Sequence, residues 1–150
     1  MLEIFVDADA CPVKEEVMRV ADRHRLIVHM VGNRWIRLPE NPRLKRVVVP
    51  AEPDAADDWI AEHIGAGDIC VTQDIPLAAR CLEKGAKAIG NTGKPFTPDS
   101  IGNALAMRDL MATLRETGEI TGGPASFTKA DRSRVLQALE DAVQAVRRGR

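Results

Sequence analysis

The stretch LEIFVDADACPVKEEVMRVA, residues 2–21, shows the order of elements from which the rest of the chain is built. Its first residues, 2–6, form a short and mostly apolar run, which predicts a buried β-strand. Pro12 stands where a helix opens, because proline fits the first helical turn, and Val13 and Val17 follow at helical spacing. The stretch therefore predicts a strand, a polar loop and a helix.

The same alternation continues along the chain. Strands are predicted where short apolar runs are bounded by Gly or Pro, and helices where apolar residues recur at helical spacing. The predicted strands are residues 2–6, 26–31, 47–49, 68–72 and 87–89, and the predicted helices begin near residues 12, 54, 76, 98 and 128. Residues 118–124 are predicted to form a loop, and Thr128 and Asp131 have the spacing of a helix capping box. Because strands that alternate with helices pair in parallel, the sequence predicts an α/β fold.

The length and composition exclude several classes of protein. A chain of 150 residues with 45% hydrophobic and 29% charged residues is typical of one folded domain. The low share of aromatic residues, 3% with no Tyr, argues against recognition of single strands by stacking bases on exposed rings. The formal charge of -1 means that any basic surface for nucleic acid has to be local.

The cysteines and the N-terminal residues favour a cytoplasmic protein. Cys11, Cys70 and Cys81 lack the spacing of metal ligands, which indicates reduced thiols. Residues 1–9 lack the basic and long apolar regions of a secretion signal, and no stretch approaches the roughly 18 apolar residues of a membrane span. We therefore expect a cytoplasmic location without membrane association.

Carboxylates follow two of the predicted strands. Asp7 and Asp9 come directly after the first strand, and Asp74 follows Thr72 and Gln73 at the end of the fourth. Ligands of parallel sheets bind beyond the carboxyl ends of the strands, and carboxylates gathered there repel one another unless a cation lies between them. Their oxygens suit Mg²⁺ or Mn²⁺. The alternative is a structural role, in which these side chains cap the helices that follow.

The helix predicted from residue 54 adds three more acids, Asp54, Asp57 and Asp58. If Ile60 points to the core, Asp57 lies about 60° from that direction, Asp54 about 120° and Asp58 about 160°. Asp57 is therefore the inward candidate. Acids in a first turn are also stabilised by the helix dipole without any catalytic task, and Asp54 could cap the helix, so a structural role remains open.

Five motifs together carry a resemblance to a known family. They are VDADACPVK at 6–14, DAADDWI at 54–60, VTQDIPLA at 71–78, GKPFT at 93–97 and FTKADR at 127–132. On these motifs, which span nearly the whole chain, the protein resembles the uncharacterised bacterial YaiI/YqxD family, which looks related to the PIN-like metal-dependent nucleases. The resemblance implies a single PIN-like domain over residues 1–150. Its fold would be a three-layer sandwich in which a parallel five-stranded sheet, in the order 3-2-1-4-5, lies between helices, with further helices at the C-terminus.

The resemblance also implies an activity. Asp7, Asp57 and Asp74 match the acids with which PIN-like nucleases bind metal, whereas Asn91 stands where many of them carry a further acid. The implied reaction is hydrolysis of phosphodiester bonds, with RNA as the expected substrate, by a water molecule activated on Mg²⁺ or Mn²⁺.

The residues around these acids have predicted roles in the same reaction. The predicted catalytic residues are Asp7, Asp9, Asp57 and Asp74, and Asp9 and Asp54 are additional candidate metal ligands. The predicted contacts to substrate are Lys14, Thr72, Asn91, Arg108 and Arg132.

Other functions remain open from the sequence. A binding module that holds a nucleotide or RNA without cleaving it is favoured by Asn91. An aspartyl-phosphate phosphatase would use Asp7 as nucleophile and Asp9 as acid, but VTQD at 71–74 does not supply the usual late arrangement of such enzymes. Cys11 at a helix start could have a lowered pKa, yet no His is placed to act as its base, which disfavours a thiol enzyme.

Overall fold

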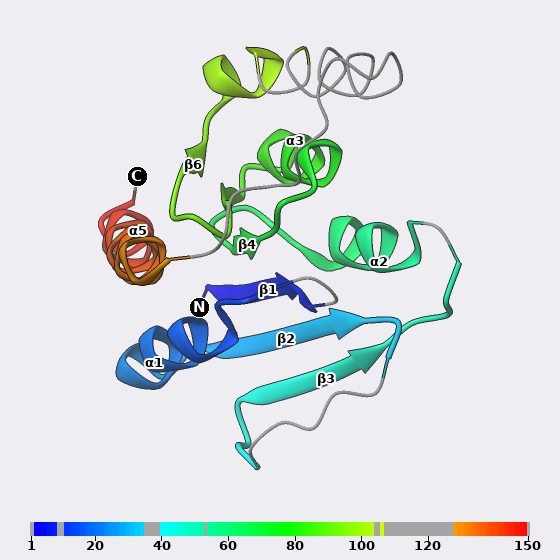
Figure 1. The fold of residues 1–150 in the computed structure, drawn as a ribbon, viewed down its shortest axis with the longest axis horizontal. Helices are drawn as coiled ribbons and strands as arrows, with labels where there is room; N and C mark the ends of the chain where they lie inside the picture. Colours follow the sequence, from blue (N-terminus) through cyan, green and yellow to red (C-terminus); the bar gives the residue numbers. More distant parts are fainter. Residues whose placement is uncertain are drawn as a thin grey trace.

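The structure is a computed structural model of the chain, and it describes residues 2–8, 11–34, 40–52, 54–103, 106 and 128–149. These residues form one six-stranded sheet with helices around it (Figure 1). In chain order, the elements are β1 (Glu3–Asp7), α1 (Lys14–His24), β2 (Ile27–Gly32), β3 (Leu44–Val48), α2 (Ala55–His63), β4 (Ile69–Val71), α3 (Ile75–Glu83), β5 (Lys87–Ile89), β6 (Pro95–Phe96) and α5 (Lys129–Arg147). Residues 98–103 are also helical. Within the described ranges, no helix has the length and apolar character needed to cross a membrane.

The sheet confirms the predicted strand order and adds one strand to it. β1 lies between β2 and β4, and the order across the sheet is β3-β2-β1-β4-β5-β6. The first five strands are parallel, as predicted, and β6 pairs antiparallel with β5. β6 lies in the GKPFT motif and spans only Pro95–Phe96. It is too short to stand out as an apolar run, which explains why the sequence predicts five strands.

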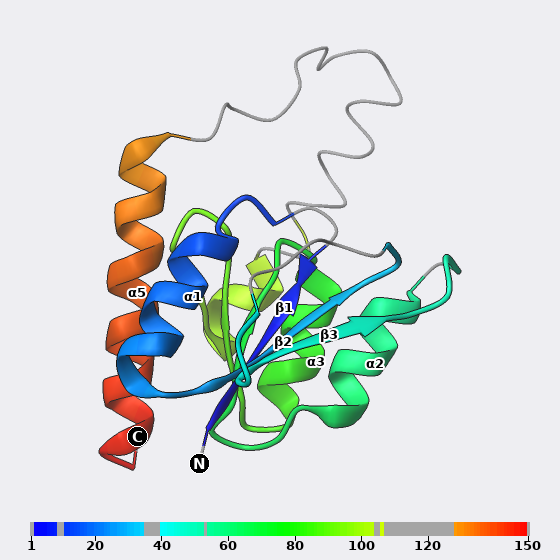
Figure 2. The same ribbon diagram turned by 90° about the horizontal axis from the view of Figure 1, so that it is seen from below.

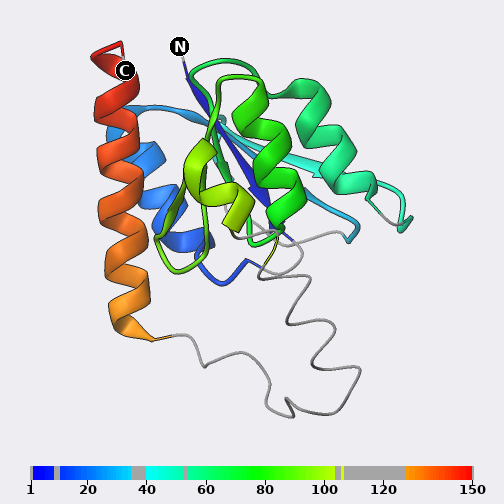
Figure 3. The same cartoon turned by 90° about the horizontal axis from the view of Figure 1, so that it is seen from above.

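Helices on both faces of the sheet give the molecule three layers (Figures 2 and 3). α1 and α5 pack together on one face, and α2 and α3 pack together on the other. Successive residues of β1 enter different cores: Ile4 and Val6 pack with α1 and α5, whereas Phe5 packs with α2 and α3. A strand that is buried on both faces reads as a continuous apolar run, which is why residues 2–6 identify it. The architecture is consistent with a PIN-like sandwich.

The third strand differs most from its predicted limits, and the helix predicted from residue 98 is described only in part. The third strand begins at Leu44 rather than within the predicted range 47–49. It lies at the edge of the sheet, where Lys45 and Arg46 are exposed. Because the first part of the strand contains these charged residues, the apolar pattern predicts only its second part. The helix predicted from residue 98 is present over residues 98–103, whereas the predicted loop at 118–124 falls outside the described residues.

The start of α5 confirms the predicted capping box. The Thr128 hydroxyl oxygen accepts a hydrogen bond from the Asp131 backbone N–H at 3.1 Å, and the Asp131 carboxylate accepts one from the Thr128 backbone N–H at 2.9 Å. The bond from the Thr128 backbone lowers the pKa of Asp131, because it favours the ionised carboxylate. These bonds define where α5 begins, and Val135 and Leu139 then pack into the core shared with α1.

Gly93 lets the turn between β5 and β6 pass close to α5. Its φ of +85° lies in the left-handed region that favours glycine. A Cβ atom at this position would lie 2.5 Å from the backbone carbonyl carbon of Arg134 in α5. The turn and the helix are therefore packed with no room for a side chain.

Replacing Gly93 with Ala is expected to destabilise the protein by about 2–4 kcal/mol, because left-handed backbone strain adds to the clash with Arg134. Gly102 provides the matched control, since it is helical and no atom lies within 4 Å of the place its Cβ would take. Gly102→Ala should be neutral or stabilise by up to about 1 kcal/mol. Urea denaturation gives the free energy of unfolding of each variant, and equal effects of the two substitutions would contradict this role of Gly93.

Candidate active site

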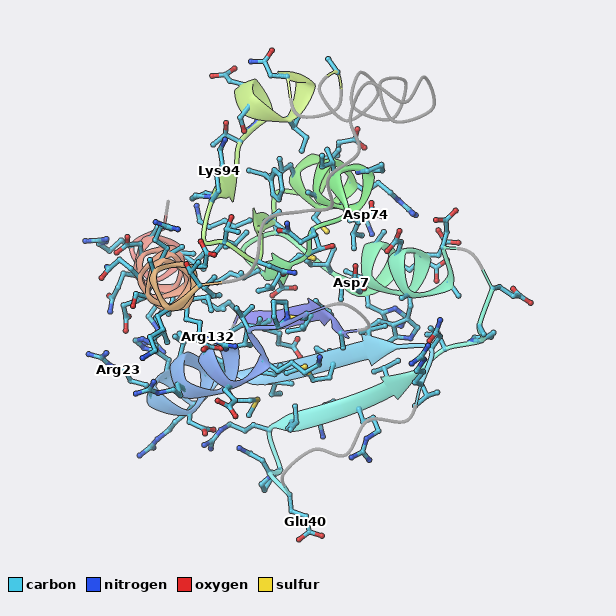
Figure 4. The ribbon with its side chains drawn as sticks, viewed as in Figure 1. Asp7, Arg23, Glu40, Asp74, Lys94 and Arg132 are labelled. Atoms are coloured by element: carbon cyan, nitrogen blue, oxygen red, sulfur yellow. The ribbon has the colours of Figure 1, made fainter. Side chains whose placement is uncertain are left out.

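The parallel strands bring predicted site residues to one edge of the sheet. β1 and β4 are neighbours, with Val6 beside Val71, so Asp7 at the end of β1 and Thr72 after β4 lie next to each other. The Thr72 hydroxyl donates a hydrogen bond to Asp7 Oδ2 at 3.0 Å and accepts one from the Asp74 backbone N–H at 2.9 Å. Because Thr72 is buried, these bonds hold the two strand ends in place. Figure 4 shows Asp7 and Asp74 at this edge, beside α2 and α3.

Asp74 also has the structural role that its place before a helix allows. Its Oδ1 accepts a hydrogen bond from the Leu77 backbone N–H at 2.9 Å, which caps α3. A carboxylate has two oxygens, and the bond to Leu77 uses Oδ1, which leaves Oδ2 able to bind a ligand. Capping the helix and binding a ligand are therefore compatible at this residue.

Asp57 on α2 faces the acids at the strand ends. Burial raises the pKa of Asp57 to about 7, and the negative charges of Asp74 and Asp7, the hydrogen bond with Asp74 and the charge of Asp54 add to the effect. Burial and nearby negative charges both disfavour the ionised form of a carboxyl group, so such a group keeps its proton to near neutral pH. The structure thus brings Asp7, Asp57 and Asp74 together.

Asp57 and Asp74 line a pocket of about 430 Å³, whose walls also include Asp54, Asp58 and Arg80. Asp54 precedes α2 with a left-handed φ of 64°, and its side chain makes no capping hydrogen bond, so the cap that the sequence allowed for it is not formed. Asp58, which the helical phase placed away from the core, is exposed. It pairs with Arg80, with 2.8 Å between its Oδ1 and Arg80 Nη1.

The donor atoms of this cluster suit a hard divalent cation. Asp7, Asp57 and Asp74 offer carboxylate oxygens, which Mg²⁺ and Mn²⁺ prefer, and a cation would take the place of the proton that Asp57 holds. Among the described residues, no three His, Cys, Asp or Glu side chains form a ready-made metal-binding group. Asp9, an additional predicted ligand, falls outside the described residues. Metal binding here stays a prediction.

Two of the predicted substrate contacts bind the segment between β1 and α1. Lys14 Nζ donates to the Cys11 carbonyl at 2.8 Å, and Arg132 Nη1 donates to the Pro12 carbonyl at 3.1 Å. Arg132 Nη1 also lies 2.9 Å from Glu16 Oε1, and Glu16 is buried on α1. Glu16 is not among the predicted site residues. Its position on the apolar face of its helix could have indicated a buried carboxylate that needs a partner. These contacts tie α5 to the loop after β1, and contact with a substrate stays a prediction.

The remaining predicted contacts lie beyond β4 and β5 or outside the described residues. Asn91 is buried after β5, and its backbone N–H donates to Gln73 Oε1 at 2.5 Å. Gln73 therefore links the ends of β4 and β5. Its position in the VTQD motif at 71–74, next to Thr72 and Asp74, is the one feature of the sequence that could have indicated this role. Arg108 falls outside the described residues.

The cysteines are buried and free of disulfides. Burial raises the pKa of the Cys11 thiol, so the lowered pKa that its place near a helix start allowed is wrong. The reason is that removal from water penalises the thiolate more than the neighbouring backbone and Lys14 favour it. A reactive thiolate at Cys11 is therefore disfavoured.

Comparison with known proteins shows similarity along almost the whole chain. The profile of a family described as "Uncharacterized BCR, YaiI/YqxD family" matches residues 5–145. A UPF0178 protein of Rhodospirillum rubrum is 71% identical over 150 residues, which cover 99% of this chain and 100% of that protein. UPF0178 proteins of Parvibaculum lavamentivorans and Paramagnetospirillum magneticum are 64% and 58% identical over 148 residues, which cover 99% of this chain and 97% and 98% of those proteins. No solved structure gives a significant match.

The raised pKa of Asp57 predicts how stability depends on pH in the absence of metal. Between about pH 4 and pH 7 the folded state holds a proton on Asp57 that the unfolded state has lost, so this residue makes the protein less stable as pH rises through that window. Asp57→Asn removes the repulsion. At pH 8 the variant should be more stable than the natural protein by about 1 kcal/mol, since solvent screening of a partly exposed group reduces the effect.

Urea denaturation at a series of pH values in a chelating buffer measures this difference. The advantage of Asp57→Asn should be small near pH 4 and grow until about pH 7. Glu83→Gln, at an exposed acid on α3, is the control and should leave stability unchanged at every pH. An Asp57→Asn variant that is less stable than the natural protein at pH 8 would show that the acids do not repel one another.

Proposed function

This chain belongs to the uncharacterised bacterial YaiI/YqxD family, and we propose that it is a metal-dependent nuclease that hydrolyses phosphodiester bonds in RNA. The observation that carries the proposal is that Asp57 and Asp74 line one pocket, while Thr72 links Asp7 to Asp74 and the charge of Asp7 acts on Asp57. Such a cluster costs folding stability, and acids with strongly raised pKa values in a cleft are typical of sites for catalysis or binding.

Asp7, Asp57 and Asp74 would hold Mg²⁺ or Mn²⁺, with Asp54 on the pocket wall as a further oxygen donor. When bound, the metal supplies a water molecule of lowered pKa and positive charge that stabilises the phosphate in the transition state. Thr72 keeps the Asp7 carboxylate in a fixed orientation through its 3.0 Å hydrogen bond. The pKa of about 7 lets Asp57 give up its proton to make room for a cation near neutral pH.

The surroundings of the acids suit a phosphodiester in a polymer. The pocket of about 430 Å³ has room for a phosphate and an adjoining sugar, and Asp54 and Asp58 on its wall are exposed, so a chain could enter and leave it. The formal charge of -1 means that attraction to a polyanion depends on local groups rather than on the whole molecule. We place this activity in the cytoplasm, where the buried thiols would stay reduced.

The alternative is a module that binds RNA or a nucleotide without cleaving it. Asn91 favours this function, because a neutral amide is buried at the end of β5 where a further acid would enlarge the cluster. The carboxylates of Asp7, Asp57 and Asp74 would then hold a cation that bridges to phosphate without promoting hydrolysis.

Cleavage of labelled single-stranded RNA and DNA in Mg²⁺ or Mn²⁺ tests the proposal. Asp7→Asn and Asp74→Asn should each lower the cleavage rate at least about 100-fold, because each removes a charged metal ligand. Asn at position 74 can still cap α3, so the second variant should remain folded. Faster cleavage of RNA than of DNA is expected.

Glu83→Gln is the matched control, since it removes an exposed acid from the same helix that Asp74 caps. It should cleave like the natural protein. Cleavage that persists in chelator, or that survives both aspartate substitutions, would refute a metal-dependent nuclease at this site. Metal-dependent binding of RNA without cleavage would select the binding module.

A further inference from the structure

Arg80 on α3 lines the same pocket as the acids. Its Nη1 lies 2.8 Å from Asp58 Oδ1 on α2, and Asp57 and Asp74 line the same pocket. Of the described side chains that line this pocket, that of Arg80 carries the positive charge. A phosphate bound in this pocket would therefore lie within reach of both Arg80 and the carboxylates.

The ion pair between Arg80 and Asp58 is exposed, with 44% and 57% of the two side chains accessible to solvent. Exposed ion pairs contribute little to folding stability, because water screens the charges and ordering long side chains costs entropy. Little is lost when such a pair opens. The guanidinium of Arg80 is thus free, in energetic terms, to exchange Asp58 for another anion.

A phosphodiester presents to an arginine nearly what Asp58 presents, namely two oxygens that share one negative charge. A guanidinium binds carboxylates and phosphates in the same planar, two-pronged manner, using parallel N–H donors. Asp58 holds Arg80 through the Nη1–Oδ1 contact of 2.8 Å, and a phosphate oxygen could accept the same N–H in its place. A phosphate in the pocket would have a second attachment that Asp58 lacks, because a cation on the neighbouring acids would hold its other side.

We propose that Arg80 is a substrate-contacting residue that binds the phosphate backbone of RNA at this pocket, and that Asp58 is the internal anion released when RNA arrives. The inference rests on the proposed function in one respect, since it takes the ligand of the pocket to be a polyanion. It gives the pocket a positively charged group that can bind phosphate, in addition to the negatively charged acids.

Binding of a fluorescent single-stranded RNA of about 12 nucleotides, followed by anisotropy in Ca²⁺ over a range of salt concentrations, tests this assignment. Arg80→Ala should weaken binding about 10-fold and lower the salt dependence by about one phosphate contact, while Arg80→Lys should recover part of the affinity. Asp58→Asn should bind RNA more tightly than the natural protein, because a competing anion is gone. A merely structural pair would give both substitutions an effect of the same sign.

Arg23→Ala is the matched control, because Arg23 is an exposed arginine that pairs with Glu140 at 3.2 Å on the opposite face of the sheet. It should bind like the natural protein. Unchanged affinity and salt dependence in Arg80→Ala, or equal weakening by Arg80→Ala and Asp58→Asn, would overturn the proposal. If the natural protein binds RNA and the two substitutions act in opposite directions, but no cleavage occurs in Mg²⁺ or Mn²⁺, the role of Arg80 stands and the nuclease function fails.

Discussion

Electrostatic repulsion among the carboxyl groups of Asp7, Asp57 and Asp74 is the constraint on which the site depends. The parallel order of the sheet places the ends of β1 and β4 side by side, and α2 brings a third acid to the same place. Among the described residues, hydrogen bonds and a retained proton reduce this repulsion. Thr72 donates one hydrogen bond to Asp7, the first turn of α3 donates one to Asp74, and Asp57 keeps its proton to near neutral pH. A cation is the partner that would relieve all three acids at once.

The two faces of the sheet contribute to this site in different ways. α2 and α3 supply side chains to the pocket, including Asp57 and Arg80. α1 and α5 instead hold the loop that follows β1, through the buried Glu16, its partner Arg132 and the hydrogen bond from Arg132 to the Pro12 carbonyl. A buried carboxylate without a partner destabilises the fold. Moving α5 away from α1 would separate Arg132 from Glu16 and is therefore unfavourable. The described end of the segment before α1, at Pro12, is therefore held from the face of the sheet opposite to the pocket.

The sequence allowed the fold and the acid cluster to be predicted for reasons that are specific to certain elements. β1 is buried on both faces, so its residues form an apolar run, and the acid after it stands out. Asp57 could be distinguished from Asp58 because Ile60, which is fully buried, sets the direction of the core for α2. The two edge strands were harder to predict from the sequence, because β3 begins among exposed basic residues and β6 is only two residues long.

Ion pairs between distant parts of the chain could not be predicted in this way. Arg80 lies 22 residues from Asp58, and Arg132 lies 116 residues from Glu16. Nothing in the local pattern of either residue specifies its partner, because the pairing depends on how helices pack after the sheet has formed. The partners of Arg80 and Glu16 are therefore seen only in the three-dimensional arrangement.

Calorimetric titration of the metal-free protein with Mn²⁺ near pH 7 tests most directly whether the acid cluster is a cation site. Binding is expected in the natural protein, accompanied by release of a proton as Asp57 ionises, which repeated titrations in buffers of different ionisation enthalpy would detect. Asp7→Asn and Asp57→Asn should greatly weaken the binding, and the binding that remains in Asp57→Asn should occur without proton release. Absence of Mn²⁺ binding in the natural protein, or equal binding in the natural protein and both variants, would contradict a metal site at Asp7, Asp57 and Asp74.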